Sequence, residues 1–86
     1  MTITKTVDFL MNLDCNLWDL LGIECGSDFL NKDLTYNSLF DSYCKAVKNE
    51  LEKNGIKKIS KKVYEILENE NYHSMNRALT ILGFAA

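Results

Sequence analysis

Three glycines share one sequence context, and that context does most to constrain how this chain can fold. Each glycine comes at the end of an apolar-periodic run and is followed by a hydrophobic residue. The three segments are Leu21-Gly22-Ile23, Asn54-Gly55-Ile56 and Leu82-Gly83-Phe84. Helices commonly end this way, with glycine in the left-handed conformation and the next side chain packed back onto the last turn. The pattern predicts at least three helices, with contacts between Trp18 and Ile23, Leu51 and Ile56, and Leu79 and Phe84.

A stripe of apolar residues predicts one long helix from about residue 35 to residue 54. Its members fall three and four positions apart: Tyr36, Leu39, Phe40, Tyr43, Cys44, Val47 and Leu51. This spacing places them on a single face of a helix. Charged residues occupy the opposite face. We therefore expect this helix to be the longest one and the spine of the fold, with its other side in water.

Shorter apolar stripes predict helices before this one. A first helix is expected from about residue 4 to residue 13. Asp14 would then cap a second helix that ends at Gly22, unless the two form one kinked helix. Ser27 is expected to cap a single turn that carries Phe29 and Leu30.

Two more helices are expected after Gly55. Ser60 would cap the first of them, and the second would run from about residue 72 or 74 to residue 82. No segment alternates at a period of two residues. The sequence thus predicts an all-α bundle of about five helices, with one long central helix, in a single domain over residues 1–86.

Composition favours a folded protein without a membrane segment. The chain has 86 residues, of which 47% are hydrophobic and 26% charged, as in an ordered globule. No stretch reaches the roughly 18 apolar residues that a spanning helix needs. Nothing at the N-terminus resembles an export signal, so we expect a cytoplasmic location and no contact with membranes.

Chemistry-bearing residues are few and are spaced unlike any known site. Cys15, Cys25 and Cys44 cannot all pair within one chain, and none has a cysteine or histidine two to four residues away, as structural zinc sites do. We expect free or buried thiols acting as small hydrophobes. His73 lies in a polar junction, with no nucleophile arrangement or phosphate loop in the chain. We therefore expect no enzyme activity, catalytic residue, cofactor or metal, and a protein that acts by binding.

The two halves of the chain carry opposite charge, which decides the partners each half attracts. Residues 1–44 hold seven acidic residues and two lysines, a net charge of −5, whereas residues 45–86 hold eight basic and five acidic residues, a net charge of +3. Carboxylates on rigid helices could resemble a nucleic-acid backbone and occupy a basic groove of a protein. The predicted partner-binding residues are Asp8, Asp14, Trp18, Asp19, Asp28 and Asp33, with Trp18 as an apolar anchor.

This acidic half favours one function above the others. We expect a small inhibitor or immunity-type protein that binds a protein of a nucleic-acid-handling complex. Lysine outnumbers arginine nine to one, which suits an AT-rich coding sequence such as many bacteria and their phages carry. Because compact acidic domains without chemistry of their own are typical of inhibitors, we expect a phage or mobile-element protein with an anti-defence role. The apolar region around Trp18 also fits a homodimeric adaptor, in which that region is an interface instead of core.

The basic half suggests the alternative. The segment that carries it reads Ile59-Ser60-Lys61-Lys62-Val63, then Ile66, Leu67-Glu68-Asn69, Tyr72, Ser74-Met75, Leu79 and Leu82-Gly83-Phe84. It resembles the recognition helix and following helix of lambda-repressor-like helix-turn-helix regulators. That resemblance implies DNA contacts from Ser60, Lys61, Lys62 and Tyr64. The alternative nucleic-acid-binding residues are Lys57, Lys58, Lys61, Lys62 and Arg77, and a solubilising loop is the competing interpretation of the lysines.

Overall fold

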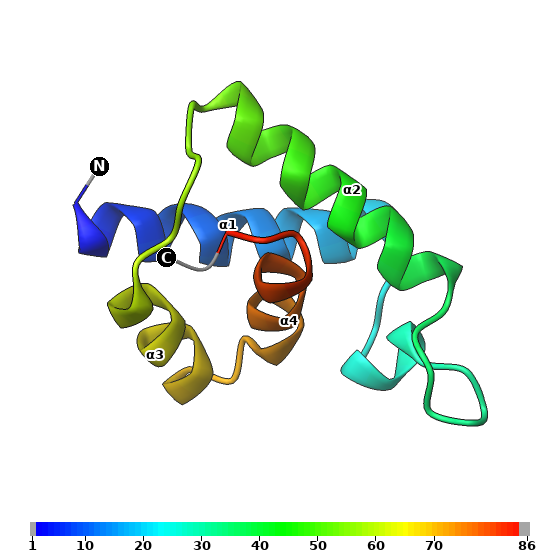
Figure 1. Cartoon of the computed structure of the whole chain (residues 1–86). Coiled ribbons are helices and arrows are strands. Elements are labelled where there is room, and N and C mark those ends of the chain that lie inside the picture. Colours follow the sequence, from blue (N-terminus) through cyan, green and yellow to red (C-terminus); the bar gives the residue numbers. More distant parts are fainter. Residues whose placement is uncertain (1, 85–86) are drawn as a thin grey trace.

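The computed structural model describes residues 2–84, which form four α-helices and one 3-10 turn (Figure 1). In chain order these are α1 (Ile3–Leu21), η1 (Gly26–Phe29), α2 (Ser38–Lys53), α3 (Lys61–Asn69) and α4 (His73–Ile81). Within residues 2–84 there is no β-strand, and one isolated bridge pairs Leu30 with Tyr36. The predicted all-α class is confirmed, with four helices and a short turn in place of about five helices.

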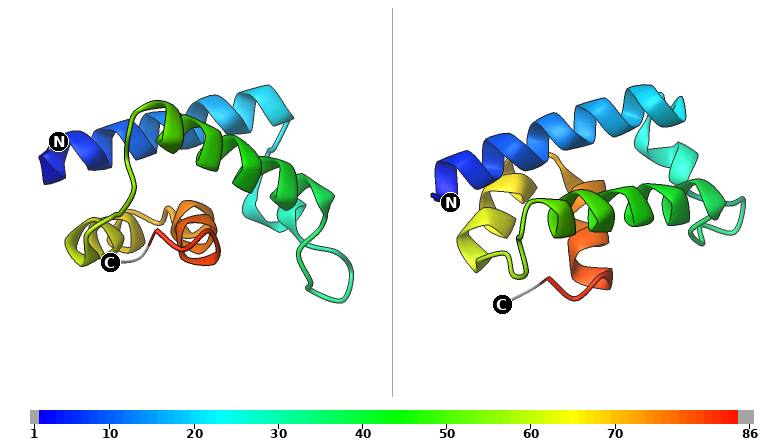
Figure 2. Two further views of the ribbon diagram at one scale, coloured as in Figure 1. Left: turned by 45° about the horizontal axis from the view of Figure 1, so that its top comes forward. Right: turned by 90° about the horizontal axis from the view of Figure 1, so that it is seen from above.

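The helices pack in a closed ring. α1 contacts α2 and α3, and α4 completes the ring by contacting α2 and α3. The two long helices, α1 and α2, lie on one side of the molecule, and the short helices α3 and α4 lie on the other (Figure 2). Buried apolar residues of all four helices and of η1 form one core. The long helix predicted at about residues 35–54 is confirmed as α2, and α1 is a second long helix beside it.

Three helix ends adopt the predicted glycine motif. The φ angles of Gly22, Gly55 and Gly83 are 71°, 71° and 83°. The residue after each glycine donates its backbone N–H to a carbonyl in the last turn: Ile23 to Trp18 at 2.9 Å, Ile56 to Leu51 at 2.9 Å and Phe84 to Leu79 at 3.0 Å. These are the pairs that the sequence predicts, so the predicted helix ends at the three glycines are confirmed.

The end of α3 uses the same motif with asparagine in the position of glycine. Asn71 has a φ angle of 65°, and the backbone N–H of Tyr72 donates to the Leu67 carbonyl at 2.8 Å. Asparagine is one of the few residues that visit this left-handed conformation regularly. The sequence indicates only that polar residues end this helix.

α1 is one continuous helix of 19 residues, so of the two alternatives a single helix is the one observed, and the division into two helices at Asp14 is wrong. α1 is also longer than α2, which has 16 residues and which the sequence predicts to be the longest helix. Asp14 lies in the middle of α1, where its carboxylate accepts a hydrogen bond from the Tyr43 hydroxyl of α2 at 2.6 Å. A side chain committed to a neighbouring helix cannot cap its own. The cap of α1 is Thr2, whose hydroxyl oxygen accepts the Lys5 N–H.

Two further caps differ from expectation. Cys25, and not Ser27, is the residue that precedes η1. Ser60 does stand at the start of α3, but its side chain forms no capping hydrogen bond. α2 begins at Ser38, because the Asn37 side chain accepts the first backbone N–H groups of that helix.

An aromatic cluster joins α1, η1 and α2. The Phe29 ring lies 5.9 Å from the Trp18 ring and 5.4 Å from the Phe40 ring, both edge to face, and 5.1 Å from the Tyr43 ring. Tyr36 stacks on the outer side of Phe40 at 4.1 Å. Such pairs stabilise a fold beyond their buried area. The cluster fixes the C-terminal half of α1 against α2.

The cysteines differ from one another. Cys44 is buried, and burial raises the pKa of its thiol to about 11. Cys15 and Cys25 are exposed free thiols, so of the three cysteines Cys44 alone serves as a small hydrophobe of the core. None of the helices in the described chain is both long and apolar enough to cross a membrane.

Candidate protein-binding surface

Two of the predicted partner-binding acids lie on one exposed face of α1. Asp8 and Asp19 are eleven residues apart, which is close to three full turns, so their side chains leave the helix in nearly the same direction, about 16 Å apart along its axis. Asn12 and Cys15 lie between them on this face and are also exposed. We call this set (Asp8, Asn12, Cys15 and Asp19) the α1 stripe.

Asp28 and Asp33 hold the turns that follow α1. The Asp28 carboxylate accepts the backbone N–H of Glu24 at 2.9 Å and that of Cys25 at 3.3 Å. The Asp33 carboxylate accepts the Thr35 hydroxyl at 2.7 Å. These hydrogen bonds lower the pKa of both carboxyl groups, so the two charges persist below neutral pH and sit on an ordered backbone.

The acidic residues of the first half form no ion pairs within residues 2–84. Within residues 2–84 the ion pairs join Lys48 to Glu52, Lys62 to Glu65 and His73 to Glu68, and all three lie in the basic half of the sequence. In the described chain, none of the seven acidic residues of the first half has a lysine, arginine or histidine within 4.0 Å. The electric field of these carboxylates therefore acts on the solvent or on a partner.

Asp14 stands apart from the other predicted acids because it is buried, with 8% of its surface exposed. Burial raises the pKa of its carboxyl group, although the hydrogen bond from Tyr43 opposes that shift. Burial also raises the pKa of the Tyr43 hydroxyl, and the negative charge of Asp14 adds to the effect. Asp14 is thus an interior charge and not part of the exposed stripe.

Two adjoining hollows lie beside Asp14, between the C-terminal half of α1 and the junction of α3 with α4. Their volumes are about 450 and 250 Å³. Both are lined by Asp14, Trp18, Asn71 and Tyr72, so they form one groove, which we call the Trp18 groove. Its larger hollow is also lined by Cys15, Asp19 and Glu70. The groove therefore borders the α1 stripe.

Trp18 belongs to both the core and the surface. Its ring packs edge to face on Phe29, and the residue is partly buried. Its indole N–H is buried and lies near the Asp14 carboxylate, without the geometry of a hydrogen bond. The remaining apolar residues of this region mostly face the core, and Leu20, 77% exposed, is the exception.

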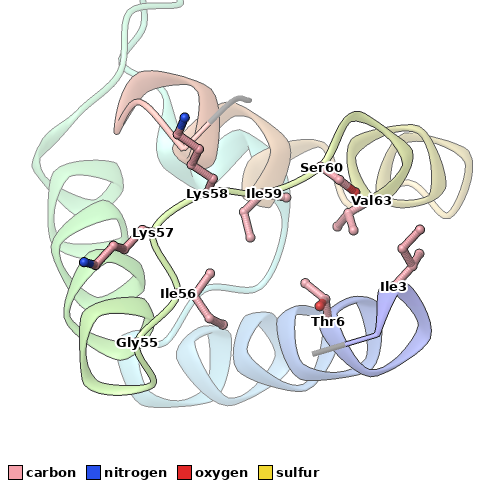
Figure 3. Close-up of a pocket in the computed structure, with 9 residues that line it drawn as sticks. All are labelled: Ile3, Thr6, Gly55, Ile56, Lys57, Lys58, Ile59, Ser60 and Val63. Atoms are coloured by element: carbon pink, nitrogen blue, oxygen red, sulfur yellow. The ribbon is translucent and has the colours of Figure 1, made fainter.

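The predicted basic residues are exposed but do not form one site. Figure 3 shows a hollow of about 370 Å³ into which Ile3 and Ile56 point, while Lys57 and Lys58 point away from it. Lys61 and Lys62 are exposed at the start of α3. Arg77 lines a different hollow and donates from Nε to the Tyr36 hydroxyl at 3.0 Å, so the structure separates it from the hollow bordered by Lys57 and Lys58.

Tyr64 does not face solvent as the helix-turn-helix resemblance implies. The residue is partly buried, and its hydroxyl oxygen is buried without a hydrogen-bond partner. The chain before α3 is extended and is held to the C-terminal end by the Ile59 N–H, which donates to the Phe84 carbonyl at 2.7 Å. Ser60, Lys61 and Lys62 remain exposed.

Sequence reasoning misses the wall of the Trp18 groove that comes from the α3–α4 junction. Glu70, Asn71 and Tyr72 lie more than fifty positions from Trp18 in the chain and meet it only through the packing of α3 on α1. Asn71, at a polar helix end, is the one sequence signal of a sharp turn there. Within residues 2–84, no three histidine, cysteine or acidic side chains gather as a metal site would require.

Comparison with known proteins gives no further guide. Scans against protein-family models, curated proteins and solved structures each returned no match. The function must be argued from this chain's own surface.

Proposed function

We propose that this chain is a non-enzymatic binding protein that recognises a basic surface of another protein. The contacts come from Asp8 and Asp19 on the α1 stripe and from Asp28 and Asp33 in the turns after it. The class that fits best is an inhibitor or immunity-type protein of a phage or mobile element, with a target that handles nucleic acid. The observation that carries the proposal is the set of unpaired carboxylates on an ordered framework.

Electrostatics explains why such a surface suits binding. Opposite charge on a partner steers the two molecules together and accelerates association, and salt screens the effect. Rigid elements hold the acids, so little side-chain and backbone freedom is lost when they meet a partner. A surface that binds nucleic acid is basic, and a row of carboxylates competes for it.

Charge reversal with a matched control tests the proposal. The chain is used as bait on an extract of the cells that encode it, and bound proteins are measured by quantitative mass spectrometry. The variant Asp8→Lys/Asp19→Lys is expected to lose the partner. The control Glu52→Lys/Glu65→Lys changes the net charge equally on exposed residues of the other half, and it should retain the partner.

Circular dichroism shows whether both variants keep the helical content of the wild type. A partner that stays bound to the Asp8→Lys/Asp19→Lys protein contradicts the proposal. So does a partner that is lost equally from both variants, because net charge alone would then explain the binding.

A second candidate function is DNA binding through the start of α3. Lys57, Lys58 and Lys61 have no acidic partner within the described residues. Ser60 leaves the first backbone N–H groups of α3 without a side-chain cap, and such groups favour phosphate. The partly buried Tyr64, whose hydroxyl oxygen does not reach solvent, weakens this candidate relative to the acidic surface.

A further inference from the structure

We propose that the Trp18 groove receives one basic side chain, arginine or lysine, of the partner protein, and that Asp14 at its base binds the cation. This inference rests on the proposed function, since it names the chemistry by which the same acidic side recognises its partner. The α1 stripe then supplies the surrounding field, and the groove supplies a specific contact.

The form of the groove suits one side chain. The larger hollow, at about 450 Å³, lies within the range of roughly 300 to 1,000 Å³ that is usual for small-ligand pockets. Trp18 and Tyr72 contribute aromatic walls from α1 and from the α3–α4 junction. A cation near an aromatic ring is attracted by the ring's quadrupole, and more strongly where water is excluded.

The charge of the groove selects a cation. Asp14, Asp19 and Glu70 all line the larger hollow, and neither hollow is lined by a lysine or arginine. His73 lines the smaller one and is paired with Glu68 at 3.0 Å. A buried carboxylate without a counter-ion is costly, and a guest cation would offset that cost.

Asp14 has an acceptor to spare. Its Oδ1 atom accepts the Tyr43 hydroxyl, and no hydrogen bond from the described residues reaches Oδ2. The residue is more than nine-tenths buried, yet it lines both hollows. The free carboxylate oxygen of a residue that lines an aromatic groove provides the charge-assisted hydrogen bond that an ammonium or guanidinium group requires.

The end of α3 forms the rim of the groove. Asn71 lines both hollows, and its φ angle of 65° is the left-handed conformation that ends this helix. That conformation places Tyr72 at the edge of the groove. The indole N–H of Trp18, which lines both hollows, is buried and has no hydrogen-bond partner among the described residues.

Titration with a small probe tests the groove without any partner protein. N-acetylarginine amide is added to the ¹⁵N-labelled chain, and N-acetylcitrulline amide, which has the same shape without the charge, serves as control. Trp18 is the one tryptophan, so its indole N–H gives a single resolved signal. We expect that signal to shift saturably with the arginine probe, with a Kd on the order of 1 mM, and to stay unchanged with citrulline.

Two substitutions assign the effect to Asp14. Asp14→Asn keeps the shape of the side chain and the acceptor for Tyr43 but removes the charge. It should raise the Kd of the arginine probe about tenfold. Glu52→Gln removes the same charge from an exposed residue of α2 that lines neither hollow, and it should leave the Kd within about twofold. If Asp14→Asn does not fold, the exposed pair Asp19→Asn/Glu70→Gln takes its place, with an expected loss of at least threefold.

Equal shifts from the citrulline probe overturn the inference, as does an unchanged Kd in the folded Asp14→Asn protein. The probe titration tests the groove and the capture experiment tests the proposed function, so either one can fail without the other. If the probe result fails while reversal of Asp8 and Asp19 still abolishes partner capture, only the groove assignment is lost. If the probe binds as expected and capture is unaffected by charge reversal, the proposed function is the part that fails.

Discussion

At the scale of single residues, Asp14 is the one acidic residue within residues 2–84 that the fold buries. It lies inside the fold with one hydrogen bond, from Tyr43, to stabilise its charge. Because burial raises the pKa of this carboxyl group, folding favours the protonated form. The contribution of Asp14 to stability is therefore largest in acid and is lost as the pH rises above its ordinary pKa of 3.8.

This behaviour is opposite to that of most folded carboxylates and can be measured against Asp14→Asn. As the pH rises from about 3 to 7, the free energy of unfolding of the wild type should fall relative to that of the variant. At pH 7 the variant should be at least as stable as the wild type. Urea unfolding followed by circular dichroism at several pH values gives the comparison. If the free energy of unfolding of the wild type instead rises relative to that of the variant as the pH increases, the buried position of Asp14 is contradicted.

Asn71 offers a second residue-scale prediction. Glycine adopts a φ angle of 65° without penalty, so Asn71→Gly should stabilise the chain by up to about 1 kcal/mol, and Asn71→Ala should destabilise it by about 1 kcal/mol. Thermal unfolding of the two variants shows whether each substitution raises or lowers the stability of the chain. The same sign for both substitutions would show that Asn71 is held by its side chain and not by its backbone conformation.

At the scale of elements, α1 and α2 are joined by the Tyr43–Asp14 hydrogen bond inside the aromatic cluster. Tyr43→Phe keeps the ring and removes the donor, which leaves a buried carboxylate without its hydrogen bond. We expect a loss of about 2 kcal/mol in the free energy of unfolding at pH 7. In the Asp14→Asn background the same substitution should cost clearly less, because an amide replaces the charge. Equal losses in both backgrounds would contradict a direct coupling of the two residues.

The helix ends were predictable from sequence, because their motif is local. Glycine before a hydrophobic residue determines the last turn with little help from the rest of the chain, and all three such sites agree with the structure. The number of helices was less predictable. Asp14 has the chemistry of a cap, and only its tertiary partner Tyr43, twenty-nine residues away, reveals that it lies within a helix.

The candidate site was predictable in part, because local patterns reveal some of its residues and only tertiary packing reveals the others. Exposed acids such as Asp8 and Asp19 follow from charge pattern and helical period. The Trp18 groove depends on the meeting of α1 with the α3–α4 junction, and no local pattern links Trp18 to Tyr72. Long-range packing is the information that a single sequence leaves open.

At the scale of the whole molecule, the chain forms a small bundle whose radius of gyration is 12.3 Å. Six of the seven acidic residues of the first half lie on α1 and the turns after it, four lysines lie near the start of α3, and α2 carries charges of both signs. A mimic of nucleic acid should not itself bind DNA. We expect no shift of a random-sequence duplex in gel electrophoresis at 50 mM salt. A shift that weakens steeply as the salt is raised would favour the lysine surface instead.

The central claim is that the acidic side of the molecule meets the partner. At 9.9 kDa the chain suits a footprint by ¹H–¹⁵N NMR with the captured partner added. We predict signal changes along the α1 stripe, at Asp8 and Asp19, and at Trp18 and Tyr72 in the groove, with little change at residues 57–62. A footprint centred on residues 57–62, with the α1 stripe unchanged, would contradict the account.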